Sequence, residues 1–131
     1  MASFGYTVDP ATVVRGDMRE QGGFEAANAL IKQQALPRAL FVVNNLMTLG
    51  VLRATRRAGI KVPDDLAIIG FDDVPWAPFL DPPLTVVAQP TNEIGSTAAE
   101  LLLDHLSGGP TETVRRVLDP ALIIRQSCGC P

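Results

Sequence analysis

The sequence predicts an α/β protein in which helices cover a mostly parallel, doubly wound sheet. Two continuously apolar segments, 39–43 and 66–71, have the composition of strands that are buried on both faces. One stretch with helical periodicity precedes the first segment, and another separates the two. Strands that alternate with crossover helices form parallel sheets with right-handed connections. With 131 residues and 47% hydrophobic content, the chain has enough apolar material for one core.

The amino-terminal part predicts a strand, a helix and a second strand. A β-branched run at 12–15 predicts the first strand, which ends at Gly16-Asp17. Apolar residues then recur at helical spacing: Phe24, Ala27, Ile31 and Ala35. Pro37 ends that helix. We expect the strand over 39–43 to be central and parallel.

A second crossover helix is predicted after this strand. Asn45 is favoured as its N-cap, and Gly59 as its end. Its apolar stripe consists of Met47, Val51, Ala54 and Ala58. A turn at 62–65 then leads into the buried strand over 66–71.

The chain after Asp73 is rich in proline, which predicts a short helical turn and loop over 74–83. The alternating segment 84–88 predicts a strand, and the stripe from Ile94 to Leu106 predicts a third amphipathic helix. Two further strands are expected at 113–118 and 121–125.

Charge and cysteine content limit the function classes. Eleven basic residues against fourteen acidic residues give a net charge of -3, opposite to the charge that binds nucleic acid phosphates. We therefore expect no DNA binding by this segment itself, and a solvated face for the basic residues between Arg53 and Lys61. Cys128 and Cys130 are interpreted as thiols in a reducing cytoplasm rather than as a metal site, because no second ligand pair accompanies them.

No membrane or export segment is expected. No apolar run reaches the roughly 18 residues that span a bilayer. The first six residues lack the charged and apolar regions of a signal peptide. The expected location is therefore the cytoplasm.

Polar side chains follow the predicted strands at the edge where open parallel sheets bind ligands. They are Asp17 with Met18, Asn44 with Asn45, Asp72 with Asp73, and Gln89. A carboxylate accepts from two hydroxyls, and an amide both donates and accepts, which suits a sugar or a nucleoside. Met18, Trp76 and Phe79 would supply apolar cover for a ring.

Structural roles compete with ligand contact at these positions. Helix capping is favoured over ligand contact for Asn45 and Asp73, whereas the two interpretations weigh equally for Asp72. Packing in a loop or an interface is favoured for Trp76 and Phe79.

The sequence indicates a protein that is not an enzyme. It contains no glycine-rich phosphate loop, no paired metal-ligand spacing and no nucleophile elbow. We therefore expect no catalytic residue, no cofactor and no metal. An alternative is a phosphorelay or enzyme module that holds a cation at Asp72 and Asp73, but convincing acidic and lysine partners are missing at the other strand ends.

Several ordered motifs between Gly16 and Cys128 together resemble the LacI/GalR family of bacterial transcription regulators. Segment 43–50 resembles the family's Asn-Asp-x-Met-Ala-x-Gly motif, and 59–73 its Pro-x-Asp strand with a Gly-Phe-Asp-Asp turn. Segment 82–90 is similar to its Pro-Pro-Leu-Thr-Thr-Val-x-Gln-Pro stretch, and 125–128 to its usual ending.

The resemblance implies a periplasmic-binding-protein-like (type I) effector domain, mainly its C-terminal lobe. Residues 1–90 and 119–131 are expected in that lobe, and 91–118 are expected to pack on the N-terminal lobe. That lobe and the DNA-binding headpiece are expected upstream of residue 1. The resemblance also implies a homodimer that contacts operator DNA only through the headpiece.

The resemblance assigns roles to individual residues. Asp72 would grip the hydroxyls of a sugar or nucleoside, and Asn44 would line the same cleft. Met18 occupies a position that is often aromatic in the family. Leu49 and Leu80 occupy positions near the dimer interface. With Asp17 and Gln89, the expected ligand-binding set is Asp17, Met18, Asn44, Asp72 and Gln89. The alternative with the same fold is a sugar-binding protein of a transport system.

Overall fold

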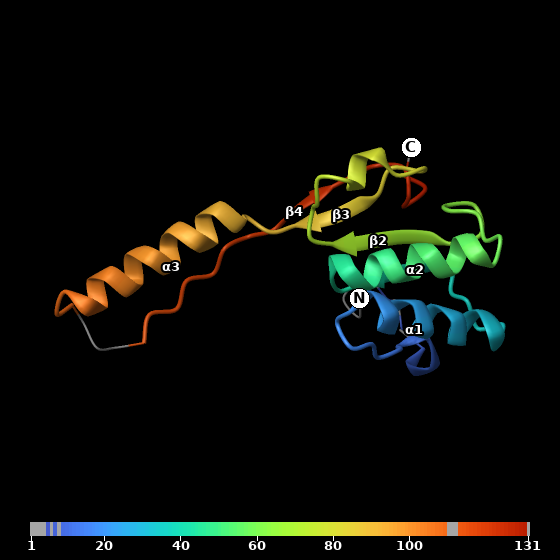
Figure 1. Cartoon of the computed structure of the whole chain (residues 1–131), viewed down its shortest axis with the longest axis horizontal. Coiled ribbons are helices and arrows are strands. Elements are labelled where there is room, and N and C mark those ends of the chain that lie inside the picture. Colours follow the sequence, from blue (N-terminus) through green and yellow to red (C-terminus); the bar gives the residue numbers. More distant parts are fainter. Residues whose placement is uncertain (1–4, 6, 8, 110–112, 131) are drawn as a thin grey trace.

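The computed structural model describes residues 5, 7, 9–109 and 113–130. They form an α/β body and an arm that extends away from it, where the arm comprises α3 and residues 113–118 (Figure 1). The predicted α/β class is confirmed, with an open sheet that is mostly parallel.

The described sheet has four strands in the order β1-β2-β3-β4. Their bounds are Ala39–Val42 for β1, Ala67–Phe71 for β2, Thr85–Ala88 for β3 and Ala121–Ile123 for β4. The first three strands run parallel, and β4 runs antiparallel to β3. The carboxyl ends of β1, β2 and β3 therefore lie along one edge of the sheet.

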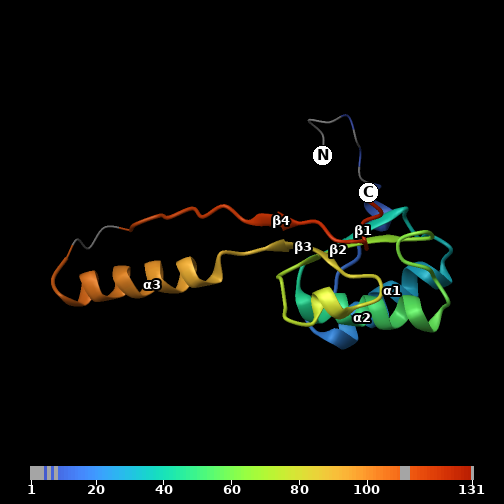
Figure 2. The same cartoon turned by 90° about the horizontal axis from the view of Figure 1, so that it is seen from above.

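Two helices, α1 (Glu20–Lys32) and α2 (Asn45–Arg57), lie side by side on the same side of the sheet (Figure 2). They approach closely because Gly23 and Gly50 stand at their contact. A Cβ atom on Gly50 would clash with the carbonyl oxygen of Glu20, and one on Gly23 would clash with that of Met47. The core forms where α2 meets the sheet, and it includes Val51, Ala54, Ile68 and Val86.

The predicted strand over 12–15 is wrong. A short 3-10 helix, η2 (Pro10–Thr12), replaces its start, and the chain from 13 to 18 is irregular. The amides of Thr12 and Val13 donate to the carbonyls of Asp9 and Pro10, so these donors are used within a local turn. In the described sheet, β1 is consequently an edge strand rather than the expected central one.

Helix α2 is capped by Asn44, one residue earlier than predicted. The Oδ1 of Asn44 accepts a hydrogen bond from the Met47 amide at 2.8 Å. Asn44 has extended backbone, as an N-cap requires, whereas Asn45 is already helical. The prediction of Asn45 as N-cap is therefore wrong by one position.

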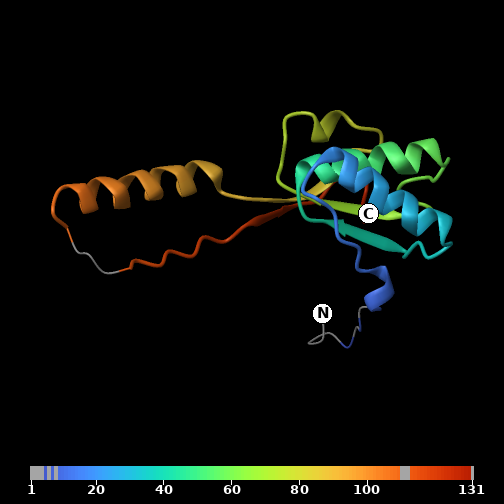
Figure 3. The same ribbon diagram turned by 60° about the horizontal axis from the view of Figure 1, so that its bottom comes forward.

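The predicted turn after Asp73 is confirmed as the 3-10 helix η3 (Ala77–Phe79). Helix α3 (Thr91–Leu106) is also present at its expected place, but none of its residues is buried. Residues 113–118 run back beside α3 without forming the expected strand (Figure 3). That part of the arm lies away from the sheet, so no sheet strand is there to pair with it.

Candidate ligand-binding edge of the sheet

The strand register brings the predicted site residues to the carboxyl edge. Val42 pairs with Gly70, so Asn44 lies level with Asp72, two residues beyond that pair. Phe71 pairs with Val87, which places Gln89 next to the end of β2. Residues that are far apart in the sequence thus meet at one edge, as the sequence predicts.

Asp72 and Gln89 form the central polar pair of this edge. The Nε2 of Gln89 donates to the Oδ1 of Asp72 at 2.6 Å. The backbone amide of Asp72 also donates to the carbonyl oxygen of Val87 at 2.9 Å. In the described part of the chain no residue donates to Oδ2 of Asp72, which leaves this oxygen available to a hydroxyl donor.

Asn44 links the edge to the loop before α1. Its Nδ2 donates to the carbonyl oxygen of Met18 at 2.8 Å, while its Oδ1 caps α2. Both polar atoms of this amide therefore have protein partners. Asn44 positions the Met18 loop and starts α2, and any ligand contact would have to compete with those two hydrogen bonds.

Met18 and Asp17 lie in that loop. Met18 is 54% exposed at this edge. The Oδ1 of Asp17 accepts from the Arg19 amide at 2.9 Å, and Gly22 leaves room for this carboxylate. Asp17 consequently lies at the amino end of α1, where the helix dipole favours negative charge.

Two site residues have unusual backbone geometry. Among the described non-glycine residues, positive φ occurs at Met18 (65°), Gln34 (53°) and Asp72 (73°). This left-handed region is unfavourable for residues with a side chain, although aspartate tolerates it better than most. Strain of this kind concentrates at functional sites because surrounding contacts must hold it. Here the contacts are the Asn44–Met18 and Gln89–Asp72 hydrogen bonds.

Asp73 forms an ion pair with Arg125, so the prediction that it caps a helix is wrong. The Nη2 of Arg125 lies 2.9 Å from the Oδ2 of Asp73. Its Nη1 donates to the carbonyl oxygen of Leu84 at 2.7 Å, and its backbone amide donates to the hydroxyl of Thr85. Asp73 thus points toward residues 124–130, the tail that follows β4, where Arg125 lies.

Arg125 and Ser127 attach the segment after β4 to the sheet, and the sequence reasoning gave neither a role. The Oγ of Ser127 donates to the carbonyl of Ile68 at 2.7 Å and accepts from the Thr85 amide at 2.8 Å. These bonds join β2 and β3 to the tail. The signal was present in the Arg-Gln-Ser-Cys ending, since charged and hydroxyl side chains next to a strand often satisfy buried backbone groups.

The predicted apolar residues divide into packed and exposed ones. Trp76 and Leu80 pack against the core, whereas Phe79 is 86% exposed. Leu49 is 37% exposed on α2. The expected role of Trp76 and Phe79 as ring cover stays a prediction.

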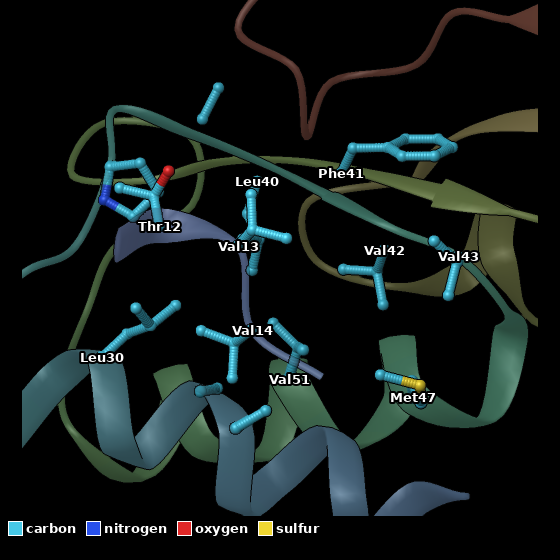
Figure 4. A pocket seen from close by; sticks show the side chains of 14 residues that line it. Thr12, Val13, Val14, Leu30, Leu40, Phe41, Val42, Val43, Met47 and Val51 are labelled. Atoms are coloured by element: carbon cyan, nitrogen blue, oxygen red, sulfur yellow. The ribbon is translucent and has the colours of Figure 1, made fainter. Parts of the chain in front are cut away.

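A separate cavity of about 350 Å³ lies between α1, β1 and residues 12–14 (Figure 4). Its walls are mostly apolar, and Figure 4 shows Val13, Val14 and Leu30 turned toward the side chains of β1. The cavity lies beside residues 12–14, which belong to the segment that was expected to form the first strand. A sugar or nucleoside needs polar partners that this cavity does not offer.

The described residues contain neither a membrane-spanning helix nor a cluster of metal ligands. None of the helices in this part of the chain is long and apolar enough to cross a membrane. Over the same residues, no group of three or more His, Cys, Asp or Glu side chains is arranged to hold a metal ion.

Comparison with known proteins gives a consistent family pattern. A family model described as periplasmic binding protein-like domain matches residues 1–128. The chain is 44% identical over 123 residues to the HTH-type transcriptional repressor CytR of Escherichia coli (strain K12), covering 94% of this chain and 36% of that protein. It is 37% identical over 129 residues to the HTH-type transcriptional repressor PurR of Photobacterium profundum, covering 97% and 38%.

Solved structures agree with these sequence relatives. A complex of the transcriptional regulator CelR with cellobiose superposes with a TM-score of 0.89 at 37% identity, over 96% of this chain and 38% of that one. A LacI family regulator from Arthrobacter sp. FB24 in complex with lactose gives 0.75 at 34% identity, over 86% and 42%. The chain spans just over a third of the length of the curated relatives it matches.

Proposed function

We propose, from the premise that this chain belongs to the periplasmic binding protein-like domain family, that it is part of the effector-sensing region of a LacI-type transcription regulator. In this proposal a small polyhydroxylated molecule, a sugar or a nucleoside, binds at the carboxyl edge of the sheet. Its binding changes the affinity of the whole regulator for operator DNA.

The Asp72–Gln89 pair carries the proposal for ligand binding. Asp72 holds a strained, left-handed backbone directly after β2, and Gln89 fixes one of its carboxylate oxygens at 2.6 Å. A preoriented carboxylate with a second available oxygen is suited to accept hydrogen bonds from hydroxyls. The exposed Met18 side chain beside Asn44 supplies an apolar surface for the carbon face of a ring.

The ligand class follows from this chemistry and agrees with the structural relatives. Structures that resemble this chain hold cellobiose, lactose or ribose. Each of these ligands carries several hydroxyls on a ring. A nucleoside presents the same kind of hydroxyls through its ribose, and it adds a base that Met18 would cover less well than an aromatic residue.

The arm supports the proposed domain boundaries. We expect residues 1–90 and 119–131 in one lobe, and 91–118 packed on another lobe of the same regulator. None of the residues of α3 is buried, and its apolar residues Ile94, Leu102 and Leu106 are exposed. Contact with another lobe would bury this surface, which is favourable at roughly 25 cal/mol per Å².

Two further partners belong to the proposal. A homodimer would use the apolar surface near Leu49 and Leu80, which lies on and beside α2. Operator DNA would be contacted by a headpiece and not by this segment, whose net charge of -3 repels phosphates. A regulator of this kind acts in the cytoplasm.

The transport-protein alternative is not favoured, because the curated relatives described above are transcriptional repressors. Such repressors are not enzymes. The Asp73 carboxylate, which the enzyme alternative would use, pairs with Arg125 at 2.9 Å.

A thermal-shift screen of sugars and nucleosides tests the proposal. A ligand at about 100 times its dissociation constant adds about 2.7 kcal/mol to the stability of the folded state. We expect a hit that stabilises the chain and the control variant Asp64→Ala, which removes a carboxylate at the opposite end of β2, but not Asp72→Ala. A hit that stabilises all three proteins equally would refute the site.

A further inference from the structure

The two cysteines of the chain lie together in a tight turn beyond the last strand. Both are free thiols, Cys128 being half-buried and Cys130 exposed. Gly129 has a φ of 71°, and its amide donates to the carbonyl oxygen of Gln126 at 3.1 Å. This glycine reverses the chain between the cysteines, because the left-handed region costs glycine little.

The turn brings the cysteines into direct contact. The backbone amide of Cys130 lies 3.3 Å from the Sγ of Cys128, which accepts its hydrogen bond. The same sulfur lies 3.5 Å from the carbonyl oxygen of Arg125. The Cys128 sulfur is therefore held between a backbone donor and a backbone acceptor.

The turn is attached firmly to the sheet. Ser127, which precedes Cys128, is only 1% exposed and bonds both Ile68 and Thr85. The side chain of Arg125 is held by Asp73 and Leu84. The cysteine pair is consequently anchored at its amino-terminal side, while Cys130 remains accessible to solvent.

The two thiols differ in acidity. Burial alone would raise the pKa of Cys128, but hydrogen bonds from the Cys130 side chain, Thr85 and nearby backbone outweigh it and lower that pKa below its usual value. Donation to Cys128, together with slight burial and the neighbouring sulfur's charge, raises the pKa of Cys130. Because the thiolate is the nucleophilic form of a thiol, the lowered pKa favours Cys128 over Cys130 as the attacking sulfur.

A metal ion explains the pair less well than sulfur chemistry does. Zinc sites that are closed by protein need about four ligands. Within the described residues, no group of three or more His, Cys, Asp or Glu side chains is placed to hold a metal. Two adjacent thiols without further ligands fit an oxidation that forms a bond between them.

We propose that Cys128 and Cys130 form an oxidisable dithiol that low-molecular-weight disulfides convert into an intramolecular disulfide. The Cys128 thiolate attacks one sulfur of the small disulfide, forms a mixed disulfide and expels one small thiolate. Cys130 then releases its proton to solvent, and its sulfur attacks the Cys128 sulfur and expels the second thiolate. Two cysteine thiols are oxidised to one disulfide, and the small disulfide is reduced to two thiols.

Incubation of the full chain with oxidised glutathione at neutral pH, followed by intact mass measurement, tests this proposal. We expect a monomer that has lost two hydrogens. Cys130→Ser should stop at one mixed disulfide on Cys128, because the serine hydroxyl keeps a hydrogen-bond donor but cannot attack. Stable mixed disulfides on the wild-type chain, or disulfides between chains, would overturn the proposal.

The rate of reaction separates a structured pair from two ordinary thiols. Cys130→Ser, which keeps Cys128, should react faster than Cys128→Ser, which keeps Cys130, because the held sulfur of Cys128 has the lowered pKa and more of it is thiolate at neutral pH. In urea, where the turn is unfolded, the two variants should react at similar rates. Equal rates in the folded proteins would contradict the proposed asymmetry.

Discussion

The side-chain amide of Gln89 holds the carboxylate of Asp72 at 2.6 Å across the carboxyl edge of the sheet. The two residues are separated by a whole strand connection and meet only because β2 and β3 run parallel in this register. Gln89 leaves one oxygen of Asp72 without a partner among the described residues, so the pair is both ordered and able to bind a hydroxyl.

The first prediction concerns that pair. Gln89→Leu removes the donor that orients Asp72, so we expect ligand affinity to fall about tenfold, the equivalent of roughly 1.4 kcal/mol. Because Gln89 is exposed, unfolding free energy should change by less than about 1 kcal/mol. Isothermal titration and urea unfolding measure the two effects. Gln126→Leu, at an exposed position in the tail, is the control, and an affinity loss of the same size there would argue against a specific role for Gln89.

The second prediction concerns the cation behind the edge. Arg125→Met removes two side-chain hydrogen bonds, to Asp73 and to the Leu84 carbonyl, and should destabilise the chain by about 2 kcal/mol after allowance for partial exposure. Arg125→Lys should recover only part of this stability, because an ammonium lacks the planar fork that reaches both acceptors. Urea unfolding is the measurement, with Arg57→Lys on the exposed end of α2 as control. A fully stable Arg125→Lys variant would show that the two-acceptor geometry contributes little.

The third prediction concerns the buried hydroxyl that ties the tail to the sheet. Ser127→Ala leaves the Thr85 amide and the Ile68 carbonyl without their present partner, so we expect a loss on the order of 3 kcal/mol in unfolding free energy. Ser96→Ala, on the exposed face of α3, should change stability by less than about 0.5 kcal/mol. Thermal unfolding of both variants is the comparison, and equal melting temperatures would contradict the assigned role of Ser127.

The fourth prediction concerns the contact between α1 and α2. Gly50→Ala places a methyl group against the backbone of Glu20 and Phe24, which cannot move aside easily, so a loss of about 1–3 kcal/mol is expected. Gly95→Ala, in the middle of α3 with nothing within 4 Å of the new methyl group, should instead stabilise the helix by up to about 1 kcal/mol. Circular dichroism during urea unfolding distinguishes the two signs. A neutral Gly50→Ala would mean that the helices separate without cost.

The sequence predicted the elements whose pattern is local. The apolar runs that became β1 and β2, the turn at η3 and the stripe of α3 all correspond to described elements. The convergence of Asn44, Asp72 and Gln89 on one edge was also predictable, because it follows from strand direction alone.

Features that depend on competing partners were harder to predict. Residues 12–15 have strand propensity, yet the amides of Thr12 and Val13 bond within a turn and β1 becomes an edge. Asp73 was expected to cap a helix, but it pairs with Arg125, which lies 52 residues later in the sequence. Strand pairing and ion pairing over such distances are decided by tertiary structure, which overrides local propensity.

Ligand binding at the carboxyl edge can be tested directly by NMR titration of the isotopically labelled chain with a sugar or nucleoside that stabilises it in the thermal-shift screen. We expect the backbone signals of Met18, Asn44, Asp72 and Gln89 to shift with one saturating curve. In Asp72→Ala these shifts should be abolished, while its other signals stay at native positions. Shifts confined to Val13, Val14 and the apolar cavity beside β1, or shifts that persist unchanged in Asp72→Ala, would contradict ligand recognition at the carboxyl edge.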